Sequence, residues 1–350
     1  MRRQLRKLLV SCVAAITMGL AGPAVARDAL PRDADVIGVG KETSAQLFQY
    51  FMQQYGRVDT ETTFYFYPLD QHEGVERFTK GRADFLVLDS GQTDYAPPEL
   101  VEKLTMVPVI ANAVVLIYNL PGLEGDLRLS REVYASIFTG EITVWNDERI
   151  ARLNPGVELP ELEITTVHRS EPSHTTLIFT RHLNRVSDSW QKSGIGFGVS
   201  VDWPGTSMGD RRNAGVAMKV QRSHGSIGYV DFSTAKRGGL SMAILENSSG
   251  VFIVPSAETT TLTIANLSVT ALSDLIDRID DPPGNTSYPI VACRWVVVPT
   301  HPVDRSKSAK ITSFIEWILT DGQNSLLEFG YSPLPENVRA MAYKELERVE

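Results

Sequence analysis

The sequence predicts an α/β fold large enough for two domains. Along most of the chain, segments with a strand-like apolar pattern alternate with segments of helical spacing, and this alternation is typical of α/β proteins. A length of 350 residues allows two domains, each with its own core. The composition, 43 % hydrophobic and 22 % charged, is that of a globular protein without low-complexity tracts.

Local patterns place the individual elements. Leu47, Phe48, Phe51 and Met52 recur at helical spacing, and Asn-Leu-Pro-Gly at 119–122 marks a turn. We expect strands at 35–40, 63–67, 84–88, 105–118, 164–168, 225–230 and 293–299. We expect helices at 44–55, 74–80, 131–138, 147–153, from 173 onward, and at 306–319, 324–329 and 335–347.

The first 26 residues have the features of a secretory signal. Basic residues are followed by the apolar stretch 8–20 and by the small-residue site Ala24-Val25-Ala26, so we expect cleavage after Ala26. The run 9–12 looks like a lipoprotein box, but almost no apolar sequence precedes it, so lipidation of Cys12 is the less favoured interpretation. No later segment has about 18 uninterrupted apolar residues, and the mature chain is not predicted to span a membrane.

Charge and cysteine content limit the classes of ligand and the kinds of site that the chain can have. The signal carries Arg2, Arg3, Arg6 and Lys7 and no acidic residue, so its removal takes the net charge from −8 to −12. Such an acidic chain is not expected to bind nucleic acid. An anion site must therefore be built locally, from backbone amides and a buried arginine. Cys293, the one cysteine left after cleavage, lies in an apolar run and is expected in the core.

One part of the chain carries most of the functional information. It comprises the runs Ile-Phe-Thr-Gly-Glu-Ile-Thr-Val-Trp-Asn-Asp at 137–147, Leu-Asn-Pro-Gly at 153–156 and Val-His-Arg-Ser-Glu-Pro-Ser-His-Thr-Thr at 167–176. The last run places Arg169 and a Ser/Thr cluster where a strand is predicted to end and a helix to begin. Helix N-terminal amides, hydroxyl groups and an arginine fork are the donors that hold a small oxyanion.

These runs resemble, almost word for word, the second-domain signature of the phosphate-binding proteins that serve Pst-type ABC importers. The likeness extends to Gln-Arg at 221–222, Gly-Ser-Ile-Gly-Tyr at 225–229, Trp317 and Tyr-Ser-Pro-Leu-Pro at 331–335. The resemblance implies the fold of type II periplasmic binding proteins, in which two lobes, each a mixed sheet flanked by helices, are joined by two hinge strands.

The resemblance also implies the limits of the lobes. The chain would cross between them near residues 118–119 and 293–296. A signal peptide at 1–26 would then be followed by lobe I at 33–118 plus 293–350, with lobe II inserted at 119–292.

Five residues match the family's ligand site in type. Asp89 matches the aspartate that accepts a hydrogen bond from the proton on phosphate, and such an acceptor disfavours sulfate, which has no proton to give. Arg169 matches the arginine that clamps the anion, and Glu171 matches the carboxylate that orients this arginine. Ser173 and Thr175 keep hydroxyls at the start of a helix.

Two loops of the first lobe depart from the family pattern. Glu42 falls where the family places a ligand-binding threonine, and Thr43 can supply a hydroxyl in its place. A carboxylate at Glu42 would repel phosphate if it pointed inward, and would be harmless if it faced solvent. In the second loop, Gln71 can donate from its amide where the family has a serine, and His72 is expected on the surface at a helix start.

The loop after Arg169 also differs. Pro172 removes a backbone donor, and His174 puts an imidazole where the family has glycine. Three outcomes stay open: phosphate binds to rearranged donors, a different or larger anion replaces it, or a metal is bound by carboxylates and imidazoles. The metal alternative, the least favoured because Arg169 would repel a cation, would use Glu42, His72, Asp89, Glu171 and His174.

The resemblance implies a monomeric periplasmic protein without cofactor or metal. It would capture phosphate or a similar oxyanion in the cleft between the lobes and deliver it to an inner-membrane ABC permease. The sequence contains no Gly-x-Ser-x-Gly, His-Glu-x-x-His or GxxxxGK[ST] motif, so we do not expect an enzyme. Two alternatives remain: a non-transport envelope protein that acts as sensor or scaffold and, less favoured, a phosphate-ester hydrolase.

Overall fold

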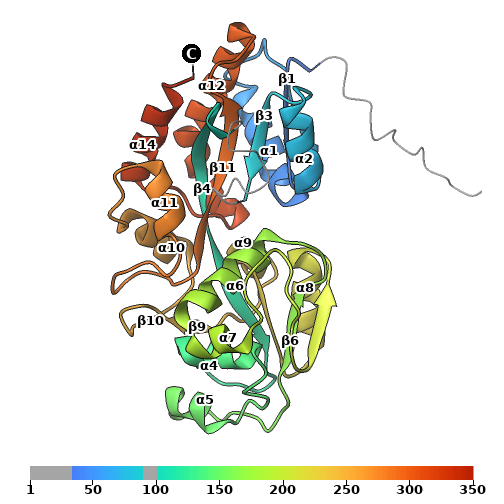
Figure 1. Cartoon of the computed structure of the whole chain (residues 1–350), viewed down its shortest axis with the longest axis vertical. Helices are drawn as coiled ribbons and strands as arrows, with labels where there is room; N and C mark the ends of the chain where they lie inside the picture. Colours follow the sequence, from blue (N-terminus) through green and yellow to red (C-terminus); the bar gives the residue numbers. More distant parts are fainter. Residues whose placement is uncertain (1–33, 90–100, 350) are drawn as a thin grey trace, which may run out of the picture.

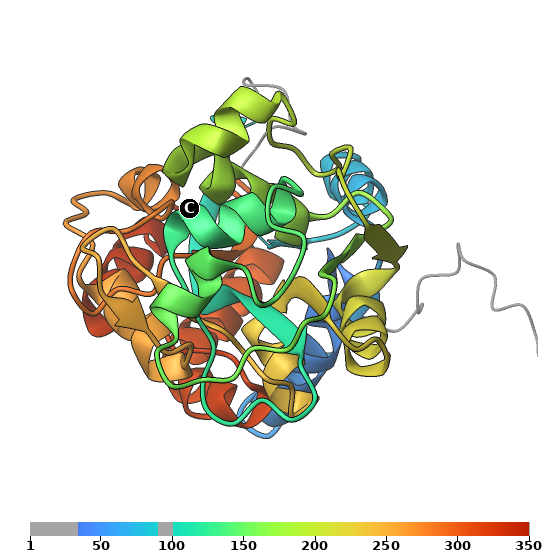
Figure 2. The same cartoon turned by 90° about the horizontal axis from the view of Figure 1, so that it is seen from below.

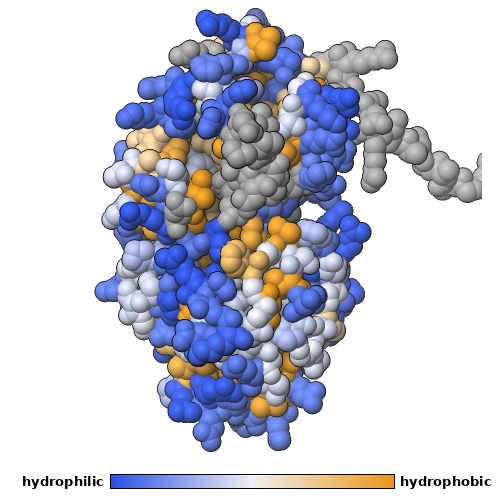
Figure 3. Space-filling view, viewed as in Figure 1, coloured by the Kyte–Doolittle hydropathy of each residue, from blue (hydrophilic) through white to orange (hydrophobic). Residues whose placement is uncertain are grey.

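The computed structural model describes residues 34–89 and 101–349, which form an upper and a lower lobe along the long axis of the molecule (Figure 1). The predicted signal peptide and Cys12 lie outside these residues. Within them, no helix has the length and apolar character needed to cross a membrane. Most side chains on the face shown in Figure 3 are hydrophilic, and apolar atoms on that face gather close to the level where the lobes meet.

One eight-stranded sheet runs through both lobes in the order β2-β1-β3-β11-β4-β8-β6-β7. Its strands are β1 (Val36–Gly40), β2 (Phe64–Pro68), β3 (Phe85–Leu88), β4 (Leu104–Asn119), β6 (Thr165–Arg169), β7 (Ser207–Asp210), β8 (Ser226–Asp231) and β11 (Val291–Pro299). Strand β1 is parallel to both of its neighbours, β2 and β3, and β6 is parallel to β7 and β8. Strand β11 is antiparallel to β3 and β4. The predicted α/β class and two-lobed architecture are confirmed.

Strand β4 belongs to both lobes. Its first part, up to Ala113, pairs with β11, and its last part, from Val114 to Asn119, pairs with β8. Most residues of β4 are buried, as expected for a strand covered by helices on both faces. The change of partners falls inside β4, before the crossing at 118–119 that the resemblance implies. The division into 33–118 plus 293–350 and 119–292 stays a prediction.

Helices cover the sheet of the upper lobe. They are α1 (Glu42–Tyr55), α2 (Gln71–Thr79), α12 (Arg305–Leu319), α13 (Asp321–Asn324) and α14 (Glu336–Leu346). Helix α1 packs on β2 and α12, whereas α2 packs on β1 and β3. Helices α10 (Ala257–Ala265) and α11 (Leu272–Arg278) both contact α14 and lie beside it in Figure 1.

The lower lobe surrounds β6, β7 and β8. Its helices are α4 (Arg131–Phe138), α5 (Glu148–Leu153), α6 (His174–Val186), α7 (Asp188–Ser193), α8 (Arg212–Arg222) and α9 (Phe232–Arg237). Helices α6 and α8 both pack against β8, and in the view from below the green helices and the yellow α8 lie on different sides of the teal β4 (Figure 2). A small second sheet joins β5 (Arg128–Leu129), β9 (Ile244–Glu246) and β10 (Phe252–Ile253).

Several residues of the recognised motifs serve this packing. Trp145 is fully buried and its indole donates to the carbonyl of Gly225 at 2.8 Å. Tyr229 is also fully buried, and it stacks on Phe179 with ring centroids 4.7 Å apart. Full burial of a large apolar side chain contributes about 1.5–3 kcal/mol. These motif residues therefore stabilise the lower lobe.

One predicted helix is divided in the structure. The segment expected as a single helix at 324–329 begins earlier as α13 and continues after Ser325 as a 3₁₀ turn, Leu326–Phe329. Gly330 ends it with φ of +75°, a conformation that glycine adopts without strain. Helices α8, α9, α10 and α11 and the short strands β5, β7, β9 and β10 were not predicted.

Candidate functional site

The upper face of the site begins where β1 meets α1. Two glycines allow β1 to pack closely: a Cβ at Gly38 would lie 2.1 Å from Cζ of Phe85, and a Cβ at Gly40 would lie 2.9 Å from Cζ of Phe66. The next residue, Lys41, is the N-cap of α1, so its side chain starts at the end of the helix where backbone amides are free.

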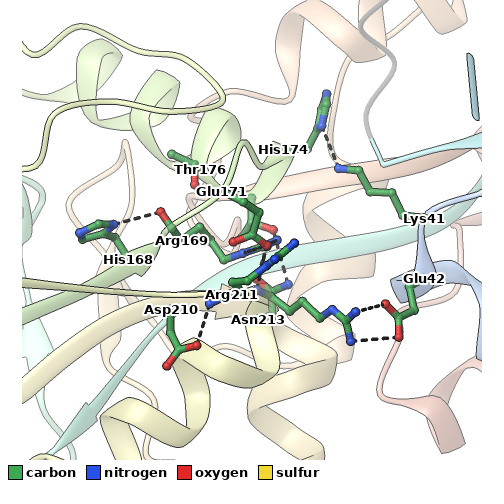
Figure 4. Close-up of polar contacts among 12 residues, drawn as sticks. Lys41, Glu42, His168, Arg169, Glu171, His174, Thr176, Asp210, Arg211 and Asn213 are labelled. Carbon is green, nitrogen blue, oxygen red and sulfur yellow. Dashed lines mark hydrogen bonds and ion pairs between the residues drawn. The ribbon is translucent and has the colours of Figure 1, made fainter. Parts of the chain in front are cut away.

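Lys41 connects the two lobes. Its ammonium lies 3.0 Å from Nδ1 of His174 in the lower lobe and 3.4 Å from Oδ2 of Asp89 in the upper lobe, and Figure 4 shows the lysine reaching toward the imidazole. Burial lowers the pKa of Lys41, and the Asp89 carboxylate opposes that effect.

Asp89 is held by a second cation. Nε of Arg294 donates to Oδ1 of Asp89 at 2.9 Å, and the Arg294 side chain is only 4 % exposed. Burial alone would raise the pKa of Asp89, but the charges of Arg294 and Lys41 hold it well below its usual value. Asp89 is therefore an ionised carboxylate with a cation at each oxygen.

The surroundings of Arg294 fix its orientation. Its guanidinium carbon lies 5.0 Å from the ring centroid of Tyr331, a cation–π contact, and the Tyr331 hydroxyl donates to the carbonyl of Thr43 at 3.1 Å. Nη1 of Arg294 and the hydroxyls of Thr43 and Ser44 are buried and have no hydrogen-bond partner within the described residues. The upper face thus keeps three buried polar groups without a partner among the described residues.

A β-bulge lies directly beside Arg294. Arg294 pairs with Ile110 whereas Trp295 pairs with Pro108, so Val109 is an extra residue in β4. Pro108 has no amide hydrogen to give to the ladder. The carbonyl of Val109 accepts a hydrogen bond from Nε2 of Gln323 at 3.0 Å. Bulges redirect side chains, and this one lies where the arginine turns toward Asp89.

The lower face is built around Arg169 at the end of β6. Its guanidinium donates to Oε1 of Glu171 through Nε at 3.1 Å and through Nη2, and to Oδ1 of Asn213 through Nη1 at 3.0 Å. The amide of Arg212 donates to the same Glu171 oxygen at 2.8 Å. Burial would raise the pKa of Glu171, but these bonds lower it. Figure 4 shows Arg169, Glu171 and Asn213 together as one network.

The start of α6 lies next to this network. Ser173 is buried and its amide donates to the carbonyl of Val199 at 2.8 Å, while its hydroxyl does not cap the helix. Oγ1 of Thr175 lies 3.5 Å from Nδ2 of Asn213. His174 is 4 % exposed, and burial together with the charge of Lys41 lowers the pKa of its imidazole to about 3. His174 is therefore neutral at pH 7.

A second contact joins the lobes at the surface. Arg212 forms an ion pair with Glu42, with Nη2 and Oε2 2.8 Å apart, and both side chains are more than half exposed. Arg212 has φ of +62°, in the left-handed region that is strained for a non-glycine residue. Glu42 thus pairs with Arg212 at the surface, in agreement with the interpretation in which this carboxylate does not repel a buried anion.

The predicted site residues divide into two groups. Arg169, Glu171 and Thr175 meet around Asn213, and Asp89 and His174 meet around Lys41. Thr43 lies on α1 beside them. Gln71 opens α2, but its side chain lies outside the described part of the structure, and His72 is exposed on the same helix.

Lys41, Arg294 and Asn213 were not identified from the sequence. Lys41 lies in the same loop as Glu42 and Thr43, and a lysine in a loop expected to bind an anion could have been predicted as a site residue. Arg294 is the one charged residue in the apolar run 291–299, and a lone buried charge indicates function or pairing. No comparable signal marks Asn213.

The described residues contain no group of three or more His, Cys, Asp or Glu side chains that could hold a metal ion. Lys41 and Arg294 place positive charge beside Asp89, and Lys41 also contacts His174. The donor set therefore suits an anion better than a divalent cation.

Comparison with known proteins gives the class. Residues 26–322 match the model of the PBP superfamily domain, and this chain belongs to that superfamily. Solved structures agree in fold. A high-affinity periplasmic phosphate-binding protein, PfluDING, aligns with a TM-score of 0.69 at 17 % identity, covering 89 % of this chain and 93 % of that one. A phosphate-binding protein from Stenotrophomonas maltophilia aligns with a TM-score of 0.61 at 17 % identity, covering 88 % and 93 %.

Within the superfamily, the chain is a member of the PstS-like phosphate-binding proteins. It is 38 % identical over 237 residues to the phosphate-binding protein PstS of Pasteurella multocida, covering 67 % of this chain and 68 % of that protein. It is 37 % identical over 236 residues to PstS of Xylella fastidiosa, covering 67 % and 64 %. It is 35 % identical over 292 residues to PstS of Methanocaldococcus jannaschii, covering 76 % and 73 %.

Proposed function

We propose that this chain captures phosphate or a similar tetrahedral oxyanion between its lobes and delivers it to an inner-membrane ABC permease. The observation that carries the proposal is the convergence of Arg169, Lys41 and Arg294, from both lobes, on one region of an otherwise acidic protein. The relatives are named phosphate-binding proteins, and the proposed function is binding without turnover.

The charges around the site favour an anion. Lys41, Arg294 and Arg169 supply three cations against the carboxylates of Asp89 and Glu171, while His174 is neutral at pH 7 because of its low pKa of about 3. The site therefore carries an excess of one positive charge, although the whole chain has a net charge of −8. Charge-assisted bonds to an oxyanion are about twice as strong as neutral ones.

Buried donors support the same proposal. Nη1 of Arg294 and the hydroxyls of Thr43 and Ser44 lack partners among the residues described, and leaving a buried donor unsatisfied costs about 1–3 kcal/mol. These groups lie at or near the N-terminus of α1, where the helix dipole also favours negative charge. An oxyanion bound there would satisfy them.

Location and partners follow the same proposal. The basic and apolar sequence before residue 27 supports export to the periplasm after cleavage at Ala26. We propose that the lobes close on the bound anion, with Lys41–His174 and Glu42–Arg212 as contacts between them. We propose a monomer that presents both lobes to the permease.

Isothermal titration of the purified protein with phosphate tests this function. Wild type should bind phosphate with a Kd in the micromolar range or tighter. Arg169→Ala should weaken binding by roughly 100-fold, because bonds to charged groups contribute about 1.5–3 kcal/mol. The control is Arg152→Ala, which removes an exposed arginine that pairs with Glu148 on α5 and should leave binding unchanged.

The wild-type titration decides the proposal. If phosphate gives neither heat nor a thermal shift with the wild-type protein, phosphate capture is wrong for this chain. If Arg169→Ala binds like the control, the lower face takes no part in binding.

A further inference from the structure

Asn213 is a buried asparagine that contacts two predicted donors of the lower face. It lies in the first turn of α8 and is 3 % exposed, and its Oδ1 accepts from Nη1 of Arg169 at 3.0 Å. Its Nδ2 lies 3.5 Å from Oγ1 of Thr175. Asn213 therefore joins the end of β6 to the first turn of α6, and Figure 4 shows it beside Arg169.

The contacts of Arg169 leave two of its N–H groups for a ligand. A guanidinium carries one N–H on Nε and two on each terminal nitrogen. Glu171 accepts one from Nε and one from Nη2, and Asn213 accepts one from Nη1. Each terminal nitrogen then keeps one N–H, and a bidentate contact with an oxyanion needs two such donors. Because Glu171 and Asn213 hold different nitrogens, together they fix the orientation of the guanidinium plane.

The same asparagine sets the role of the Thr175 hydroxyl. Arg169 has only donors, so the Asn213 atom that faces it is the oxygen, and the atom that faces Thr175 is the amide nitrogen. An amide nitrogen donates and does not accept. The Thr175 oxygen is therefore the acceptor in this contact, and its own hydrogen stays available for an anion.

The first turn of α8 is held in place by close packing. Helix α8 packs against β6, β7 and β8. A Cβ at Gly215 would lie 2.6 Å from Oδ1 of Asp210, so glycine allows the helix to approach the end of β7 closely. Asp210 also pairs with Lys219 of the same helix, with Oδ2 and Nζ 3.4 Å apart. Asn213 thus extends toward the lower face from a helix with a fixed position.

We propose that Asn213 is a positioning residue, which aligns Arg169 and Thr175 for the bound oxyanion without touching the anion itself. The inference rests on the proposed function, because it assumes that an oxyanion is bound between the lobes. Without Asn213, the guanidinium is held by Glu171 alone and the hydroxyl of Thr175 loses its fixed direction. The affinity for the anion should then fall, although both donors are still present.

Isothermal titration of the purified Asn213→Ala variant with phosphate tests the inference. Its Kd should be roughly tenfold higher than that of wild type, a loss of about 1.4 kcal/mol. Asn154→Ala is the matched control, because Asn154 is also 3 % exposed, lies in the lower lobe and bonds to the backbone of Arg128 and Ile150. Both variants should be less stable in urea, but only Asn213→Ala should bind phosphate more weakly. Asn213→Ser replaces the alanine variant if the latter does not fold.

A double-mutant cycle tests whether Asn213 acts through Arg169. In the Arg169→Ala background, the additional change Asn213→Ala should raise the phosphate Kd by less than about threefold, because the guanidinium that Asn213 aligns is absent. An equal loss of affinity in both backgrounds would mean that Asn213 acts independently of Arg169, and the inference would be wrong.

The titrations also separate this inference from the function on which it rests. If wild type binds phosphate and Asn213→Ala binds it as tightly as Asn154→Ala does, Asn213 does not position the donors, and phosphate capture stands. If wild type does not bind phosphate, the proposed function fails, and this inference fails with it.

Discussion

The two faces of the site differ in the kind of buried polar atom that has no partner among the described residues: an acceptor, Oε2 of Glu171, on the lower face and a guanidinium donor, Nη1 of Arg294, on the upper face. On the lower face, all three guanidinium nitrogens of Arg169 donate to Glu171 or Asn213. On the upper face, Arg294 keeps one buried nitrogen, Nη1, without a partner among the described residues, and Thr43 keeps a buried hydroxyl in the same condition. The guanidinium of Arg169 is thus fixed by bonds within its own lobe, whereas that of Arg294 keeps one donor without a partner among the described residues.

Replacement of Arg294 should cause the largest loss of stability among changes to the two faces. Arg294→Met removes a buried cation but keeps much of the apolar volume, and leaves Asp89 with Lys41 alone. Removal of one partner from a buried pair costs about 3–5 kcal/mol, and we expect about 3 kcal/mol because Lys41 remains. Urea unfolding followed by circular dichroism would measure the loss.

A matched control uses a more exposed ion pair in the same lobe. Lys307 and Asp84 are 3.1 Å apart, with side chains 36 % and 22 % exposed. Lys307→Ala should cost less than about 1 kcal/mol. An Arg294→Met variant as stable as this control would show that the pair with Asp89 adds nothing to the upper face.

The contact between the faces should make stability depend on pH. In the unfolded chain His174 takes up a proton below its usual pKa of 6.5, but in the folded protein its pKa is about 3. The unfolded state therefore binds more protons between pH 3 and 6.5, and stability falls as the pH falls through this window. From pH 7 to pH 5, His174 should account for a loss of about 2 kcal/mol.

Urea unfolding of His174→Gln at both pH values measures this contribution. Glutamine can still accept from Lys41 but does not titrate, so the variant should lose about 2 kcal/mol less than wild type on acidification. His72→Gln, which replaces an exposed histidine on α2, is the control and should follow wild type. Equal acid sensitivity of wild type and His174→Gln would mean that the imidazole does not link protonation to folding.

The surface contact between the lobes should make the smallest contribution to the free energy of unfolding. Glu42 and Arg212 are 61 % and 63 % exposed, so their coupling should be below about 1 kcal/mol and should decrease with added salt. A double-mutant cycle with Glu42→Gln and Arg212→Gln, read from urea unfolding at low and high salt, measures it. A salt-insensitive coupling of several kcal/mol would place this pair among the main links between the lobes.

The sequence predicted the architecture because the recognised motifs contain packing residues. Trp145 and Gly225 meet through a buried hydrogen bond, and Tyr229 packs in the same core. Residues of this kind identify a family whatever the ligand is. They explain why the strands and the lobed fold could be predicted when the details of the ligand site could not.

The site was harder to predict because its charges depend on residues far apart in the sequence. Arg169 and Glu171 are close in the chain, and their contact was expected. The partnership of Lys41, Asp89 and Arg294 joins three distant segments, and Arg294 lies beside the bulge at Val109. Side-chain reach across a folded sheet is a tertiary property, and local patterns do not contain it.

Strand β4 has a consequence for the integrity of the whole molecule. Because its first stretch completes the ladder with β11 and its last stretch completes the ladder with β8, severing the backbone between Ala113 and Val114 would leave two open sheet edges. Neither fragment should fold alone, since each would expose unpaired amides and carbonyls along a formerly central strand. Both lobes therefore depend on strand β4, and we expect them to unfold together.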